Sequence, residues 1–241
     1  NVSDTIDNTA LTLDDVNVNE GAGTATITGH LTNAPQGTPL VVTLNNGATM
    51  TFGVGSTTAP STPFAVHSED VYLDAGSYSV SVTGITGGNF ESLDTTDTST
   101  VDVSDTIDTT TLTLSGPSQI TEGGTATYIL SVNNPPQTDL QTSVQVDNVT
   151  TEDQDFTTPP GSPNTVTIPA GDTSVTFDVG TFDDNTYEGS ENYSVSIVGS
   201  PTGGNYEQLT ISASSKKTEI IDDVEMYVFS CEDLDGDRTA T

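Results

Sequence analysis

The sequence predicts an all-β protein built from two tandem copies of one domain. Three observations predict it: apolar residues alternate with polar ones along short segments, no segment keeps a helical period of 3.6, and the first half of the chain recurs in the second. The chain has 241 residues, which is enough for one large or two ordinary domains. The duplication and the strand pattern therefore decide the expected architecture.

The duplication is visible in three pairs of segments. VSDTIDNTALTL at 2–13 recurs as VSDTIDTTTLTL at 103–114, NEGAGTATI at 19–27 as TEGGTATYI at 121–129, and SYSVSVTGITGGNFESL at 77–93 as NYSVSIVGSPTGGNYEQL at 192–209. The offset between the copies grows along the unit, so the second copy carries an insertion in its middle. We expect domains at 1–103 and 104–224, followed at 225–241 by a tail or the start of a further module.

Within each copy the apolar pattern has a period of two, which is typical of strands with one buried face. Short Thr- and Val-rich runs between Gly, Pro and Asn turns predict about seven strands per copy, which fits an immunoglobulin-like β-sandwich. Residues 98–114 contain no Gly or Pro, so we expect the last strand of copy one to run into the first strand of copy two. The clearest inward-facing sets are Tyr78, Val80 and Val82; Val175, Phe177 and Val179; and Tyr193, Val195 and Ile197.

The charge excludes several classes of partner. The chain has 3 Lys and Arg residues against 35 Asp and Glu residues, a net charge of −32, and residues 1–215 contain neither Lys nor Arg. Nucleic acids and anionic membrane surfaces are excluded, because they are bound through Lys and Arg. No apolar run is long enough to span a membrane. The remaining partners are cations, water and neutral polar surfaces, and we expect a monomer.

The small apolar core needs reinforcement that disulfides cannot supply. Cys231 is the single cysteine, so there is no internal disulfide, and a metal ion is the usual substitute. No signal peptide and no initiator Met are present at the N-terminus, so we expect a fragment of a longer protein.

Carboxylates crowd together in copy two. Two unit charges about 4 Å apart repel by roughly 4 kcal/mol at an effective dielectric constant near 20. A fold that gathers them must solvate them, protonate them or bind a cation. Turns at one end of a sandwich can converge, and carboxylate oxygens from several loops suit Ca²⁺, whereas Mg²⁺ needs tighter geometry and Zn²⁺ prefers His or Cys. The competing interpretation is a set of solvated acidic loops. The acids are Glu122, Asp153, Asp155, Asp183, Asp184, Glu188, Glu191, Asp222 and Asp223.

Residues 113–224 resemble a Calx-beta domain, a Ca²⁺-binding sandwich of sodium–calcium exchangers and bacterial surface proteins. The shared motifs, in the family's order, are EGG at 122–124, DF at 155–156, IPAGDTSVTFDV at 168–179, DDNTYEGSENYSVSI at 183–197 and IIDD at 220–223. The resemblance implies that the ions lie where the acidic loops meet the end of the last strand. The implied ligands are Glu122, Asp155, Asp183, Glu188, Glu191, Asp222 and Asp223, and Asp184 is included from the same acidic run.

Copy one departs from that pattern, because SEDVYLDAG at 68–76 replaces DDNTYEGSE and leaves Leu73 and Gly76 where Glu188 and Glu191 stand. The string EDVYLDAGSYSVSVTGITGGNFESL, LNNGATMTF at 44–52 and VSDTID with its TLTL strand are similar to extender repeats of giant RTX-type biofilm adhesins, which are exported by type I secretion. That resemblance implies Ca²⁺ at the joint between domains. The implied joint ligands are Glu20, Asp70, Asp74, Asp102 and Asp105, with Asp108 as a further candidate and Asp4 and Asp7 as half of a site shared with a preceding domain.

The leading hypothesis is a calcium-rigidified spacer of a large adhesin on the bacterial cell surface, in which neighbouring repeats of the same chain and Ca²⁺ are the partners. The alternative is an adhesion module that binds a glycan, ice or a partner protein through Ca²⁺. An enzyme is not expected, because the chain offers no nucleophile–base pair, and His30 and His67 are expected to be structural or exposed.

Overall fold

The computed structural model describes residues 5–158, 160–183 and 186–223. Contacts between Cα atoms divide the chain into two compact units, unit 1 at Asn1–Thr109 and unit 2 at Thr110–Thr241. The regular structure of the described residues is all strand except for two short 3-10 turns, η1 (Glu20–Ala22) and η2 (Asp153–Asp155). The predicted all-β class is confirmed. None of the described segments forms a helix with the length and apolarity needed to cross a membrane.

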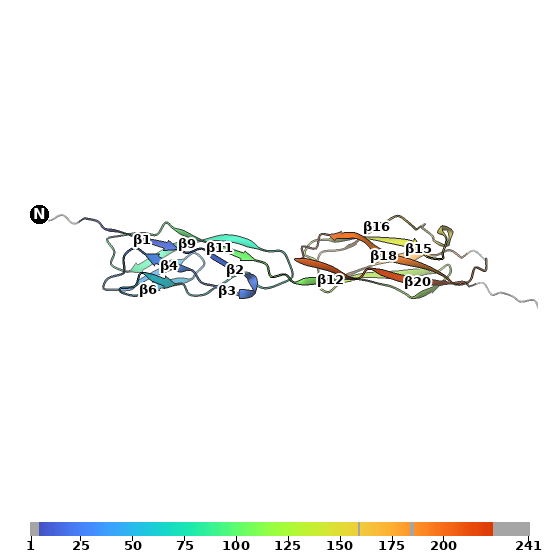
Figure 1. The fold of residues 1–241 in the computed structure, drawn as a ribbon, viewed down its shortest axis with the longest axis horizontal. Helices are drawn as coiled ribbons and strands as arrows, with labels where there is room; N and C mark the ends of the chain where they lie inside the picture. The colour runs from blue at the N-terminus through green and yellow to red at the C-terminus, as the bar shows by residue number, and fades with distance from the viewer. Residues whose placement is uncertain (1–4, 159, 184–185, 224–241) are drawn as a thin grey trace, which may run out of the picture. The chain divides into compact units, whose positions relative to one another are not determined.

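Unit 1 is a sandwich of two sheets (Figure 1). Its strands are β1 (Asn8–Leu13), β2 (Val16–Asn19), β3 (Thr24–Ala25), β4 (Thr28–Leu31), β5 (Leu40–Leu44), β6 (Thr49–Phe52), β7 (Thr58–Pro60), β8 (Phe64–Ala65), β9 (Gly76–Gly87), β10 (Ser92–Asp94) and β11 (Thr98–Ser104). The four-stranded sheet has the order β10-β1-β4-β7, the five-stranded sheet has the order β2-β11-β9-β5-β6, and β3 pairs with β8.

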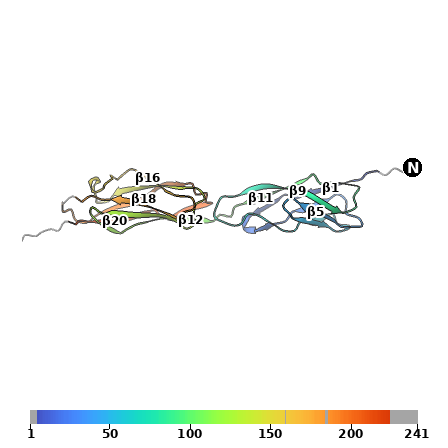
Figure 2. The same cartoon turned by 180° about the vertical axis from the view of Figure 1, so that it is seen from behind.

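Unit 2 repeats the two main sheets of unit 1 strand for strand, and its described residues contain no counterpart of the β3–β8 pair. Its strands are β12 (Thr109–Ser115), β13 (Gln119–Thr121), β14 (Thr125–Val132), β15 (Leu140–Asn148), β16 (Asn164–Ile168), β17 (Ser174–Gly180), β18 (Glu191–Thr202), β19 (Gln208–Ala213) and β20 (Ser215–Ile221). The two sheets have the orders β17-β14-β12-β19 and β13-β20-β18-β15-β16. Figure 2 shows both units from the opposite side. The longest connection within unit 2 lies between β15 and β16, where copy two carries its insertion.

The predicted inward-facing residues are buried or half-buried. Val80, Val179, Tyr193, Val195 and Ile197 are buried, whereas Tyr78, Val82, Val175 and Phe177 are half-buried. The Tyr193 ring meets Phe156 edge-on, with the ring centroids 5.2 Å apart. Apolar burial of this kind is the main stabilising term in a sandwich without disulfides.

The main sheets contain nine strands in each unit instead of the expected seven. The first strand run of each copy is divided between the two sheets, so it forms β1 and β2 in unit 1 and β12 and β13 in unit 2. In unit 1 the crossing is held by side chains, since Thr100 N donates to Asp15 Oδ1 at 2.6 Å and the Ser99 hydroxyl donates to Asp14 O at 2.7 Å. The sequence marks this crossing in unit 1, because the apolar alternation of Leu11 and Leu13 shifts phase to Val16 and Val18.

The expected continuous strand over 98–114 is wrong. β11 ends at Ser104 and β12 begins at Thr109, so residues 105–108 belong to neither. Two contacts take this segment out of the strand ladder: Thr106 N donates to Glu20 Oε1 at 2.9 Å, and Asp74 N donates to Asp105 Oδ1 at 3.3 Å. The connector therefore begins among the acidic residues of unit 1.

Candidate metal centres

In both units, a parallel strand pair brings an acid from the start of the domain next to an acid from its end. β2 runs parallel to β11 and is followed by Glu20, while β11 is followed by Asp105. In unit 2, β13 runs parallel to β20, and these strands are followed by Glu122 and Asp222. Parallel strands end at the same edge of a sheet, so the same topology builds both acidic sites.

The site of unit 1 consists of Glu20, Asp74 and Asp105. One carboxylate oxygen of each lies within 4.8 Å of the others. Glu20 is only 1% exposed, and its Oε1 accepts the hydrogen bond from Thr106 N. A carboxylate is costly to bury unless it is paired. The donor set is entirely oxygen, which fits a hard cation such as Ca²⁺.

The electrostatics of this site disfavour three ionised carboxylates. Burial raises the pKa of Asp74; His67 lowers that pKa, and the charges of Glu20 and Asp105 raise it. His67 Nδ1 lies 3.6 Å from Asp74 Oδ2. The described part of unit 1 contains no Lys or Arg that could neutralise the group, because residues 1–215 have none. A bound cation would relieve this repulsion.

Glu69 also belongs to this acidic region, and the sequence analysis missed it. Its pKa is raised by burial and by the charges of Glu20 and Asp108. A Cβ atom at Gly21 would lie 2.5 Å from Glu69 Oε2, so the absent side chain of Gly21 gives the carboxylate its space. The only sequence signal was the position of Glu69 beside Asp70 in the SEDVYLDAG segment.

Other predicted residues of unit 1 lie outside the group of three. Asp70 Oδ1 accepts a hydrogen bond from Tyr72 N at 2.8 Å, although its charge still raises the pKa of Asp74. Asp102 lies within β11, opposite Ser77 of β9, and is exposed. Asp7 N donates to Glu91 Oε2 at 2.6 Å, and Asp4 lies outside the described residues.

Unit 2 has two acidic groups that share one small pocket. One group is Glu122, Asp222 and Asp223, and the other is Asp155, Glu188 and Glu191. In each group, one carboxylate oxygen per residue lies within 4.8 Å of the others. The pocket is lined by Glu122, Asp155, Glu188, Gly189, Glu191, Ile220 and Asp222.

Asp222 holds the acidic loop in place. Its Oδ2 accepts hydrogen bonds from the backbone N–H groups of Glu188 at 2.6 Å and of Gly189 at 2.9 Å. Gly123 allows the opposite loop to approach, because its φ of +70° favours glycine and an added Cβ would lie 2.8 Å from Asp183 Cβ. The EGG motif is therefore a tight turn beside the carboxylates.

Asp183 lies next to Gly123 but belongs to neither group of three. Asp153 Oδ1 instead accepts a hydrogen bond from Asn148 Nδ2 at 2.8 Å. Asp184 and the tail at 225–241 lie outside the described residues. Of the predicted ligands of unit 2, six are brought together: Glu122, Asp155, Glu188, Glu191, Asp222 and Asp223.

The second group of unit 2 has no counterpart among the described residues of unit 1. Gly76 faces Val103 in unit 1 at the register position where Glu191 faces Ile220 in unit 2. Asp155 lies in the long connection between β15 and β16, and unit 1 has only a short turn between β5 and β6. The insertion therefore adds a second acidic group to the one that both copies share.

Glu191 is a carboxylate of this pocket with a strongly perturbed acidity. Burial, a hydrogen bond with Asp155 and the charges of Asp155 and Glu188 raise its pKa from the ordinary 4.5 to about 7. Without metal, between pH 4.5 and about 7, the folded state therefore holds a proton that the unfolded chain has already released.

We expect the following pH dependence in EDTA. Because the folded pKa is raised, the stabilising contribution of Glu191 is fully present below pH 4.5 and is lost as the pH rises through about 7. Glu191→Gln cannot release this proton, so its melting temperature should fall less than that of the wild type over this window. Calorimetry of both proteins from pH 4.5 to 8 measures the difference. Parallel curves would contradict this assignment.

Comparison with known proteins gives one family and several solved structures. A sequence model of the LapA domain matches residues 7–106 and again residues 108–223. The search of curated proteins found no match. The crystal structure of the apo form of the Calx CBD1 domain is 17% identical, with a TM-score of 0.38, over 46% of this chain and 97% of that one. The crystal structure of CBD12 from CALX1.2 is 13% identical, with a TM-score of 0.38, over 87% of this chain and 98% of that one.

Proposed function

The chain belongs to the LapA domain family, a biofilm-adhesin type of domain, and from this premise we propose that it is a calcium-rigidified spacer segment of a large bacterial surface adhesin. In this proposal the parent protein is an RTX-type adhesin exported by type I secretion, and its repeats project a distal adhesive module away from the cell. The role is structural and non-catalytic. Monomeric units linked in one chain are sufficient for it.

The observation that carries this proposal is the clustering of carboxylates in a chain with very few cationic side chains. Three groups of three acids each place one oxygen per residue within 4.8 Å, while residues 1–215 supply no Lys or Arg and Lys216 and Lys217 lie in β20. Exposed acidic groups are common without a metal. Here, however, one member, Glu20, is almost fully buried, and the same strand pair builds a site in both copies. We propose that the carboxylate groups bind calcium ions.

The proposed stiffening acts through the connector that follows β11. Asp105 belongs to the acidic group of unit 1, and Thr106 is hydrogen-bonded to Glu20. When bound, Ca²⁺ supplies strong, adaptable coordination by carboxylate oxygens. Glu20, Asp74 and Asp105 would then fix the first residues of the connector on the body of unit 1.

The energetic scale suits a switch that depends on export. Extracellular calcium sites typically have dissociation constants of about 10⁻⁴–10⁻³ M. At a free concentration 100 times the dissociation constant, each ion adds about 2.7 kcal/mol to the free energy of unfolding. The domains would therefore be less stable and less rigid inside the cell, where Ca²⁺ is scarce, and would become rigid after export.

Glu20→Gln should remove the calcium response of unit 1. Glutamine keeps an oxygen for the Thr106 hydrogen bond but removes a charged ligand, so we expect calcium binding at this site to weaken at least tenfold. Hydrogen–deuterium exchange over residues 16–20 and 98–109, with and without Ca²⁺, measures it. Asp102→Asn is the control, because Asp102 is exposed within β11 and lies outside the group. An equal loss in both variants would contradict the site.

Small-angle X-ray scattering tests the spacer function itself. In Ca²⁺, a single relative arrangement of the two units should reproduce the scattering curve of the whole chain. In EDTA, the curve should be reproduced only by an ensemble of many arrangements. Glu20→Gln in Ca²⁺ should resemble the wild type in EDTA. If Ca²⁺ stabilised each unit but left the scattering unchanged, the result would support the metal sites and contradict the rigid spacer.

A further inference from the structure

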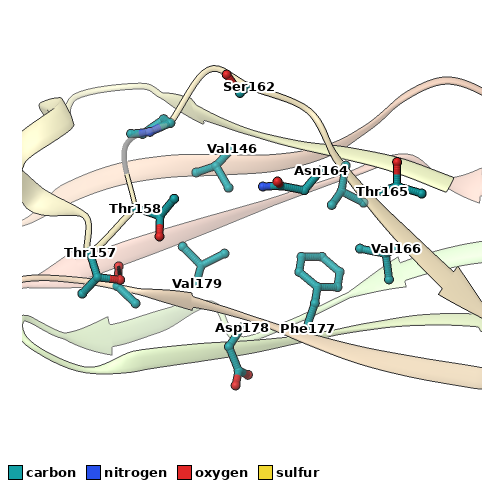
Figure 3. A pocket seen from close by; sticks show the side chains of 13 residues that line it. Val146, Thr157, Thr158, Ser162, Asn164, Thr165, Val166, Phe177, Asp178 and Val179 are labelled. Carbon is teal, nitrogen blue, oxygen red and sulfur yellow. Dashed lines mark hydrogen bonds between the residues drawn. The ribbon is translucent and has the colours of Figure 1, made fainter.

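A second pocket in unit 2 lies away from the carboxylate groups, at the open side of the sandwich between β16 and β17 (Figure 3). Its volume is about 300 Å³, which is at the lower end of the range for small-molecule sites. It shares no residue with the acidic pocket. Strands β15, β16 and β17 and the inserted loop before β16 supply its walls.

The duplicated domain shows that this pocket does not come from the fold alone. In unit 1, the corresponding strands β6 and β7 are joined by backbone contacts: Met50 and Ser61 form a bridge, and Thr62 N donates to Thr49 O at 2.8 Å. In unit 2, the inserted loop pairs with the end of β17, since Phe156 bridges to Thr181 and Thr157 N donates to Gly180 O at 3.0 Å. The loop thus forms one wall of the space between β16 and β17.

The walls of the pocket are mostly apolar and rigid. Val144, Val146, Val166, Val179 and Phe177 line it. The Phe177 ring is stacked on Tyr128, with centroids 5.5 Å apart and an angle of 19° between the planes. Strand residues and a stacked ring keep their positions without a ligand, so the pocket is pre-formed.

The polar residues of the lining are Thr157, Thr158, Ser162, Asn164, Thr165 and Asp178, of which only Asp178 is charged. Figure 3 shows the side chains of Asn164 and Thr158 turned toward the cavity, whereas Asp178 points away from it. Asp178 Oδ1 accepts a hydrogen bond from the Thr127 hydroxyl at 2.7 Å on the outer face of the sheet. Among the described residues, the Asn164 side chain makes no hydrogen bond. An amide in this position can both donate to a ligand and accept from it.

We infer that this pocket binds a small uncharged ring compound that carries one hydroxyl or amide group. The apolar walls would cover the ring, and the Asn164 amide would bind the polar group. A charged ligand would lose its hydration without gaining an ionic partner, since no charged side chain faces the cavity. This inference is independent of the metal sites and goes beyond the spacer function.

Benzamide and benzoate test the inference as a matched pair, because they share a ring and a planar head and differ in charge. The whole ¹⁵N-labelled chain in saturating Ca²⁺ is titrated with each compound. Benzamide should give saturable shifts confined to residues of the pocket, with a dissociation constant of about 1 mM or below. Benzoate should give none. Absence of saturable shifts with benzamide up to about 10 mM, or equal binding of benzoate, would overturn the inference.

Two variants and one control locate the binding. Thr158→Trp fills the cavity from the loop and should abolish the benzamide shifts, whereas Thr176→Trp, on the exposed outer face of β17, should leave them intact. Asn164→Leu keeps the size of the side chain and removes its hydrogen bonds, so benzamide should bind about tenfold more weakly. Benzamide binding that survives Thr158→Trp in a folded protein places the ligand elsewhere and refutes the pocket.

Discussion

Asp222→Asn should remove most of the calcium-dependent stabilisation of unit 2. Asp222 belongs to the group with Glu122 and Asp223, lines the pocket shared with the second group, and holds the backbone of Glu188 and Gly189 through two hydrogen bonds. Its loss therefore disturbs both groups. We expect calcium affinity to fall at least tenfold, which corresponds to about 1.4 kcal/mol or more. Calorimetric titration of the variant and the wild type measures this.

The control for Asp222→Asn is Asp172→Asn, which removes the same charge from an exposed turn before β17. The quantity to compare is the rise in melting temperature from EDTA to saturating Ca²⁺, because this difference cancels any effect of the substitution on the metal-free protein. If the two variants show the same rise, Asp222 is not a ligand.

Gly87→Ala and Gly203→Ala should each destabilise their own unit severely. These glycines occupy equivalent positions in the TGG sequences of the two copies, with φ of +82° and +88°. A Cβ atom would also run into the carbonyl oxygen of Pro39 in unit 1 and of Asp139 in unit 2. The left-handed backbone alone costs about 1–2 kcal/mol for a residue with a Cβ atom. With the clash against fixed backbone, we expect a loss above about 2 kcal/mol, which shifts the melting temperature by about 8 °C or more.

Gly53→Ala is the control for these substitutions. Gly53 is a glycine of unit 1 at which a Cβ atom would meet nothing within 4 Å, and its φ is not in the left-handed region. Its replacement should change the melting temperature by about 2 °C or less in either direction. A mild effect at both Gly87 and Gly203 would mean that these turns can rearrange.

Much of the fold follows from local patterns. The period of two across Tyr193, Val195 and Ile197 identifies a strand and its buried face, and all three residues are buried in the structure. The point at which a strand leaves one sheet for the other shows in such a pattern only as a phase shift, from Leu11 and Leu13 to Val16 and Val18. Asp14 and Asp15 hold that crossing in unit 1 through side-chain and backbone contacts with β11. The phase shift does not show that the two halves of the run join different sheets, so the number of strands was underestimated.

The acidic sites, like the fold, combine positions that the sequence indicates with contacts that it does not show. Within each unit, parallel pairing brings together the acids that directly follow the paired strands, Glu20 with Asp105 and Glu122 with Asp222. The positions of these acids could be anticipated from the strand order. Asp102 has the same chemistry but lies within β11, where its side chain points to the exposed face of the sheet. Glu69 was missed because its role depends on the space left by Gly21, which lies far away in the sequence. Spacing alone cannot show such a contact.

The pocket beside Phe177 was beyond prediction from the sequence. The insertion in copy two was evident from the growing offset between the repeats. Its effect on the sandwich, however, depends on which backbone groups the inserted loop pairs with. Thr157 bonds to Gly180 at the end of β17, and the sheet edge that unit 1 closes stays open in unit 2. An insertion therefore predicts a local change in the sandwich without saying whether a cavity results.

Thermal unfolding of the whole chain tests the central claim most directly. The melting temperature is measured in EDTA, in excess Mg²⁺ and across a Ca²⁺ titration at constant ionic strength, so that general screening of the 35 acids is the same in each sample. Our account predicts a melting temperature that climbs steeply with Ca²⁺ and barely with Mg²⁺, because the carboxylates come from several loops and suit the larger ion. A flat response to Ca²⁺ would show that the acids are merely solvated, and the calcium-rigidified spacer would have to be abandoned.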